Sequence, residues 1–138
     1  MAIEVLIMGN KRALIITYYE APNYGAFLQA YATQEFLITN GIDARILRHK
    51  ANKPNFFTRV MDNHLSTKVI EYRNQIQHEI DKVQNHLRMA NYGEQFDIAI
   101  IGSDEVWNVK NLTARHLTIF FRPYKNSSKT IAYSVCAG

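Results

Sequence analysis

The chain has 138 residues, of which 47% are hydrophobic and 20% charged, and these values are typical of one folded domain rather than a disordered segment. The single cysteine, Cys136, excludes an intrachain disulfide and a zinc site made of several thiolates. The net charge is +4, and without an RNA-binding or helix-turn-helix signature it gives no reason to expect a nucleic-acid partner. No apolar run approaches the roughly 20 residues that span a bilayer and no stretch is laid out as a secretory signal, so we expect a soluble, cytoplasmic protein.

The first expected strand is the apolar run at 13–18. Pro22 and Gly25 mark the break after this strand, and a helix is expected over 24–40. Polar side chains form one narrow wedge of that helix, and large apolar ones cover most of the remainder, so we expect it to be largely buried. These apolar residues are Phe27, Leu28, Tyr31, Phe36 and Leu37. Gly41 is a natural helix stop, and residues 42–48 form the next expected strand.

Basic residues then gather between Arg45 and Arg59, where they form either an anion-attracting patch or a solvated strand end and loop. The spacing of apolar residues predicts a long surface helix over 65–89, serving as a crossover on the sheet or, alternatively, as a dimer seam. Residues 97–102 and 130–135 are expected to be buried strands, and 112–121 is ambiguous.

Alternation of buried strands with helices predicts an α/β, Rossmann-like parallel sheet with helices on both faces. Ligands of such sheets bind beyond the carboxyl ends of the strands. Two segments at such ends, 20–26 and 102–108, are rich in polar and aromatic residues, and we expect both on the same side of the sheet. Scattered histidines without metal-ligand spacing give no reason to expect a metal site, and Cys136 is interpreted as a buried strand residue.

Three segments carry a resemblance to a known family. They are Asn23-Tyr24-Gly25-Ala26 with the Leu28-Gln29-Ala30-Tyr31-Ala32 that follows, Gly102-Ser103-Asp104-Glu105-Val106-Trp107-Asn108, and Ile131 to Gly138. Together they resemble polysaccharide pyruvyl transferases, in which Gln usually stands where this chain has Glu105. The third segment departs from the family pattern at Val135, Cys136 and Ala137. The resemblance covers a Rossmann-like domain at 11–138, and residues 1–10 are an extra strand or a non-family N-terminal extension.

The resemblance implies one half of a two-domain glycosyltransferase-like fold. It also implies transfer of pyruvate from phosphoenolpyruvate, as co-substrate and without a further cofactor, onto sugar hydroxyls as a ketal in exopolysaccharide biosynthesis. The family's donor-binding Arg and His residues lie in a second half, so this chain is expected to supply the acceptor side and to work with a second domain or as a homo-oligomer. Two alternatives stay open: a non-catalytic sugar- or nucleotide-binding module, and a truncated remnant acting through a partner chain.

The candidate substrate-binding residues are Asn23, Tyr24, Gly25, Ser103, Asp104, Trp107 and Asn108, for a sugar or a glycolipid-linked saccharide acceptor. Asp104 is also the candidate general base, because a carboxylate beside a sugar hydroxyl can accept its proton. Structural alternatives remain beside these roles. Asn23 can simply cap the helix, and Trp107 can pack in the core instead of stacking on a pyranose ring.

Overall fold

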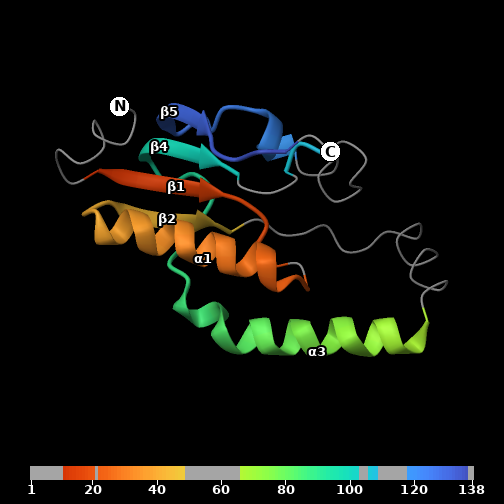
Figure 1. Cartoon of the computed structure of the whole chain (residues 1–138). Coiled ribbons are helices and arrows are strands. Elements are labelled where there is room, and N and C mark those ends of the chain that lie inside the picture. The colour runs from red at the N-terminus through yellow and green to blue at the C-terminus, as the bar shows by residue number, and fades with distance from the viewer. Residues whose placement is uncertain (1–10, 21, 49–65, 103–105, 109–117, 137–138) are drawn as a thin grey trace.

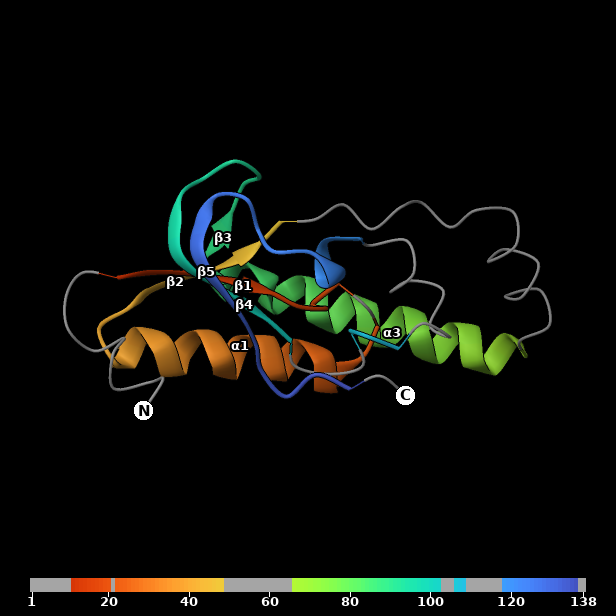
Figure 2. The same cartoon turned by 90° about the horizontal axis from the view of Figure 1, so that it is seen from above.

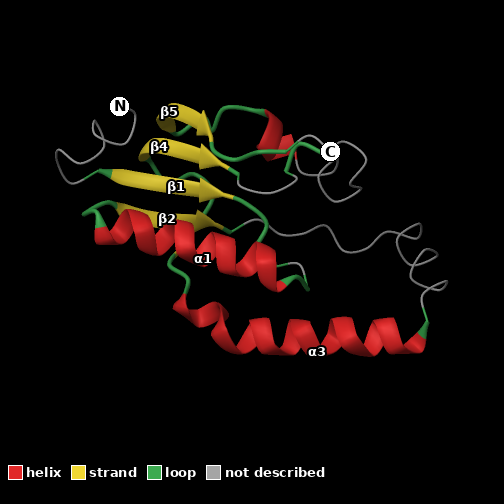
Figure 3. Cartoon of the chain, viewed as in Figure 1, coloured by secondary structure: helices red, strands yellow, loops and turns green. Residues whose placement is uncertain are grey.

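The computed structural model describes residues 11–20, 22–48, 66–102, 106–108 and 118–136. Figure 1 shows the chain and Figure 3 its secondary structure. The elements in chain order are β1 (Arg12–Ile16), α1 (Tyr24–Thr39), β2 (Asp43–Leu47), α3 (Thr67–Val83), the 3-10 helix η1 (Gln84–His86), β3 (Met89–Ala90), β4 (Phe96–Ile101), the 3-10 helix η2 (Thr118–Phe121) and β5 (Ser127–Ala132).

The strands form one five-stranded sheet in the order β3-β2-β1-β4-β5, and every neighbouring pair is parallel. This arrangement confirms the predicted α/β, Rossmann-like fold. The chain builds outward from β1 to β2 and β3 and then returns to place β4 on the other side of β1. The direction of strand order therefore reverses between β1 and β4, which is the position where doubly wound sheets bind ligands.

Two apolar clusters cover the two faces of the sheet. Both α1 and α3 contribute to the cluster on one face, together with the alternate β1 residues Ala13 and Ile15. The opposite face carries Leu14 and Ile16, and it is covered by Phe120 of η2 with other loop residues. Figure 2 shows α1 on one side of the strands and η2 on the other. In the described part of the chain, α1 and α3 thus cover one face, and of the helices predicted on both faces only the short 3-10 helix η2 lies on the other.

Helix α1 is less buried than the sequence predicted. Leu28 and Phe36 are more than half exposed, so the expectation of a largely buried helix is wrong. Its sheet-facing side instead combines Phe27 and Leu37 with small alanines and with Gln34, which is fully buried. The Gln34 amide donates to the carbonyls of Ala44 and Arg88 and accepts from the Arg88 N–H, so this polar side chain is satisfied inside the core.

Helix α3 lies on the surface, as predicted, and only Ile76 and Ile80 of its side chains are buried. It ends at Val83 rather than near residue 89, because η1 and the short strand β3 follow. Figure 1 places α3 alongside α1 beyond β2. Among the described residues, we find no helix with the length and apolar character needed to cross a membrane.

Strand β5 begins three residues earlier than expected and is not buried. The prediction of a buried strand over 130–135 is corrected, because β5 lies at the edge of the sheet and has one strand neighbour. The chain leaves the strand after Ala132, so Cys136 lies beyond it and is exposed, contrary to its interpretation as a buried strand residue.

Candidate functional site

The carboxyl ends of β1, β4 and β5 meet at the reversal point of the sheet. The backbone N–H of Gly102 donates to the carbonyl of Ile16 at 3.0 Å, and that of Tyr133 donates to Ile101 at 2.9 Å. The segments that follow β1 and β4 therefore start side by side at one edge, as the sequence predicted. We call this edge the carboxyl rim; its described candidate residues are Asn23, Tyr24, Gly25, Gly102, Trp107 and Asn108.

Gly102 is the turning point of the rim. Its φ of +116° is a backbone conformation that side chains other than glycine rarely adopt. A Cβ at this position would overlap the carbonyl oxygen of Tyr133 and lie 2.8 Å from Cγ1 of Val135. Glycine is thus required both for the turn after β4 and for the close approach of the segment that follows β5.

Asn23 caps α1. Its Oδ1 accepts the N–H of Gly25 at 2.9 Å and that of Ala26 at 3.4 Å, while its backbone carbonyl accepts the N–H of Phe27. These bonds occupy donors that a helix N-terminus would otherwise offer to an anion. Asn23 is exposed and keeps its Nδ2 amide as a donor, and the neighbouring Tyr24 is 44% exposed. The helix start therefore presents neutral hydrogen-bonding and aromatic groups.

Trp107 is anchored to the core side of the rim. Its indole Nε1 donates to the carbonyl of Phe120 at 2.7 Å, and its backbone N–H donates to Cys136. The ring is half-buried against the cluster that contains Val106 and Phe120. This anchoring is the structural role weighed above; it leaves stacking on a sugar as a prediction. Asn108 follows and is also half-buried. Ser103 and Asp104 lie outside the described residues.

Sequence reasoning missed one part of the rim. Residues Tyr133 and Ser134 were assigned to a strand, but β5 ends before them. Tyr133 is 54% exposed, and Ser134 has a φ of +48°, an uncommon left-handed conformation for a residue other than glycine. The sequence signal that could have indicated a turn here is the polar residue Ser134, which stands shortly before the small residues at 137–138.

Charge separates the two edges of the sheet. Segments 20–26 and 102–108 contain no Arg, Lys or His, although they contain Glu20, Asp104 and Glu105. At the opposite, amino edge, Arg12 and Arg45 both bridge Asp43 and Glu94. Arg45, part of the basic patch noted in the sequence, is thus engaged in ion pairs with Asp43 and Glu94.

Glu94 takes part in this amino-edge network. The backbone N–H of Asn91, followed by the Arg12 and Arg45 guanidinium groups, holds the pKa of the Glu94 carboxyl below its ordinary value. The Glu94 carboxylate is therefore ionised in the folded structure at neutral pH. Within the described ranges, no cluster of His, Cys, Asp or Glu has the geometry to hold a metal ion.

Comparison with known proteins gives one match. A family model described as polysaccharide pyruvyl transferase matches residues 23–138, a range that begins just before α1 and includes segment 102–108 and strands β2 to β5, but not β1. No curated protein and no solved structure matches the chain.

Proposed function

This chain belongs to the polysaccharide pyruvyl transferase family, and we propose on that premise that it serves in the transfer of a pyruvyl group from phosphoenolpyruvate to the hydroxyls of a saccharide. In such a transfer, two sugar hydroxyls add to the enol carbon and release two protons. One proton goes to the methylene, which becomes a methyl group, and the other leaves with the phosphate. The observation that carries the proposal is the family match over residues 23–138.

We further propose that the carboxyl rim holds the acceptor sugar. The rim offers the Nδ2 amide of Asn23, the Asn108 side chain and the exposed rings of Tyr24 and Tyr133. Amides and aromatic faces are the groups that bind a neutral sugar, through its hydroxyls and its apolar ring face. In this proposal Ser103 and Asp104 complete the site, with Asp104 as the base that accepts the hydroxyl proton.

The same rim is unsuited to the donor. Even a millimolar dissociation constant for phosphoenolpyruvate requires about 4 kcal/mol. A helix N-terminus contributes only about 0.3–1 kcal/mol to the binding of an anion, and the Asn23 side chain already accepts hydrogen bonds from two N–H groups at the N-terminus of α1. The remainder normally comes from Arg or Lys clamps, which segments 20–26 and 102–108 lack. Groups outside the rim must therefore hold the donor.

Asn23 provides a clean test of the acceptor role. An Asn23→Asp variant keeps an oxygen that caps α1 but loses the Nδ2 donor, so its thermal stability should stay close to that of the parent. We expect it to weaken binding of methyl galactoside or N-acetylmannosamine, measured by saturation-transfer NMR. The control is Asn40→Asp, which makes the same chemical change at the other end of α1. Equal saccharide binding by the parent and both variants would refute the role of Asn23.

A further inference from the structure

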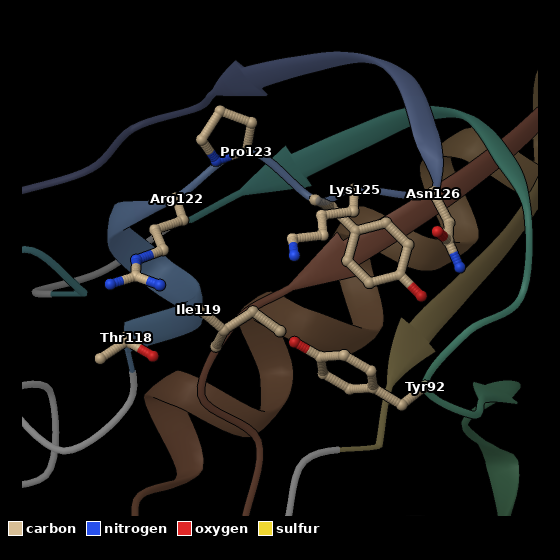
Figure 4. A pocket seen from close by; sticks show the side chains of 8 residues that line it. Tyr92, Thr118, Ile119, Arg122, Pro123, Lys125 and Asn126 are labelled. Atoms are coloured by element: carbon tan, nitrogen blue, oxygen red, sulfur yellow. The ribbon is translucent and has the colours of Figure 1, made fainter.

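A separate cavity of about 310 Å³ lies on the face of the sheet opposite α1. Its walls come from segments that are far apart in the sequence: Tyr92 after β3, Ile119 of η2, and Arg122, Tyr124, Lys125 and Asn126 from the loop that enters β5. Figure 4 shows these side chains around the cavity. The volume is at the lower end of the range for small-molecule sites.

Two cations and no carboxylate line this cavity. Arg122 and Lys125 are exposed, and neither forms an ion pair or a hydrogen bond with another residue in the part of the chain that the structure describes. The nearby carboxylate of Glu94 is already engaged by Arg12 and by the Asn91 N–H. The positive charge at the cavity is therefore not compensated there, which favours an anionic ligand.

The frame that carries the cations is held in place. The Tyr124 hydroxyl accepts the N–H of Gly93 at 3.0 Å and donates to the carbonyl of Glu94. The Asn126 amide donates to the carbonyl of Gly93 at 2.7 Å, and its backbone carbonyl accepts the N–H of Phe96. The loop entering β5 is thereby fixed to the turn before β4. A preformed site costs less conformational entropy when a ligand binds.

The remaining surface of the cavity suits a sugar ring. Tyr92 is 72% exposed, and its ring meets the ring of Tyr124 edge-on, with centroids 5.9 Å apart. This contact orients Tyr92, whose exposed ring can cover an apolar sugar face, while Ile119 adds a second apolar wall. With its Nδ2 engaged, Asn126 keeps Oδ1 as an acceptor for a sugar hydroxyl.

We infer that this cavity binds one saccharide unit that carries a negative charge, either a carboxylate or a phosphate. The ring lies against Tyr92 and Ile119, and the anionic group lies between Arg122 and Lys125. The site is distinct from the carboxyl rim and does not depend on the transfer reaction. Figure 4 shows both charged side chains on the same side of the loop that carries them.

The test is an amide NMR titration of the 138-residue chain with glucuronic acid, glucose 1-phosphate, glucose and inorganic phosphate. We expect the two acidic sugars to shift the amides of Tyr92, Gly93 and Asn126, and to bind at least about tenfold more tightly than glucose or phosphate alone. A preference for one acidic sugar identifies the carboxylate or the phosphate as the natural group.

Matched variants separate the site from general charge. Arg122→Gln with Lys125→Gln should weaken binding of the acidic sugars about tenfold, since both cations lose their charge. Lys68→Gln with Lys129→Gln makes the same change in net charge at exposed positions outside the cavity and should leave binding within about twofold. The inference would be overturned by equal weakening in both pairs of variants, or by binding of glucose or phosphate that is as tight as binding of the acidic sugars. It would also be overturned if a single-stranded oligonucleotide bound more tightly than the acidic sugars, or if no amide shifted at about 10 mM ligand.

Discussion

Replacement of Gly102 by alanine tests whether the close approach at the carboxyl rim shapes the fold. A side chain at φ of +116° carries strain of about 1–3 kcal/mol. The added methyl group would also overlap the Tyr133 carbonyl, which belongs to the backbone and moves only if the segment after β5 moves. Such overpacking costs a further 1–3 kcal/mol or so. We therefore expect a total loss of about 2–6 kcal/mol in the free energy of unfolding.

Gly93 supplies the matched control, because its φ is +99° and nothing lies within 4 Å of a Cβ placed there. Gly93→Ala should show the strain without the overlap. At about 4 °C per kcal/mol for a domain of this size, Gly102→Ala should melt roughly 4–12 °C below Gly93→Ala. Circular dichroism melting, with urea denaturation for the free energies, measures the difference. Equal melting temperatures would show that the rim does not require the contact between Gly102 and Tyr133.

Two further predictions concern buried and charged groups away from the rim. Gln34→Leu leaves buried backbone groups of Ala44 and Arg88 without partners, so it should lower the free energy of unfolding, measured by urea denaturation, by about 2–5 kcal/mol. The control Gln29→Leu changes a half-buried residue of the same helix and should lower the free energy of unfolding by no more than about 0.5 kcal/mol. Similar losses in both variants would contradict the role of Gln34. Because the folded-state pKa of Glu94 is lowered, its contribution is present above pH 4.5 and is lost as the pH falls through the lowered pKa. Glu94→Gln should therefore show a shallower loss of stability below pH 4.5 than the parent, and an identical pH profile would be evidence against the network.

The sequence predicted the parts of the fold that local signals determine. The apolar runs at 13–16 of β1 and 98–101 of β4 are continuous because these parts of the two strands are buried on both faces. Asn23 and Gly41 bracket α1 because a cap and a left-handed stop are set by the residues themselves. The adjacency of the segments after β1 and β4 followed from parallel pairing alone.

Features that depend on tertiary contacts escaped prediction. Periodicity could not show that Leu28 and Phe36 face away from the sheet, since the buried arc is fixed by Gln34 and its partners on β2 and before β3. Strand β5 has few apolar residues because it is an edge strand, so its start was misplaced. The cavity was invisible because Tyr92 and Arg122 are brought together only by the folded loops.

The acceptor-side role of this chain is tested most directly by one residue-resolved NMR experiment, in which methyl galactoside and phosphoenolpyruvate are titrated separately into the 138-residue chain. We predict that the galactoside shifts the rim amides of Tyr24, Gly25 and Asn108, and that phosphoenolpyruvate at about 1 mM leaves them unchanged. Any shifts caused by phosphoenolpyruvate should be confined to the cavity around Arg122 and Lys125. Shifts of the rim amides by phosphoenolpyruvate, without any by the galactoside, would contradict the assignment of this edge to the acceptor.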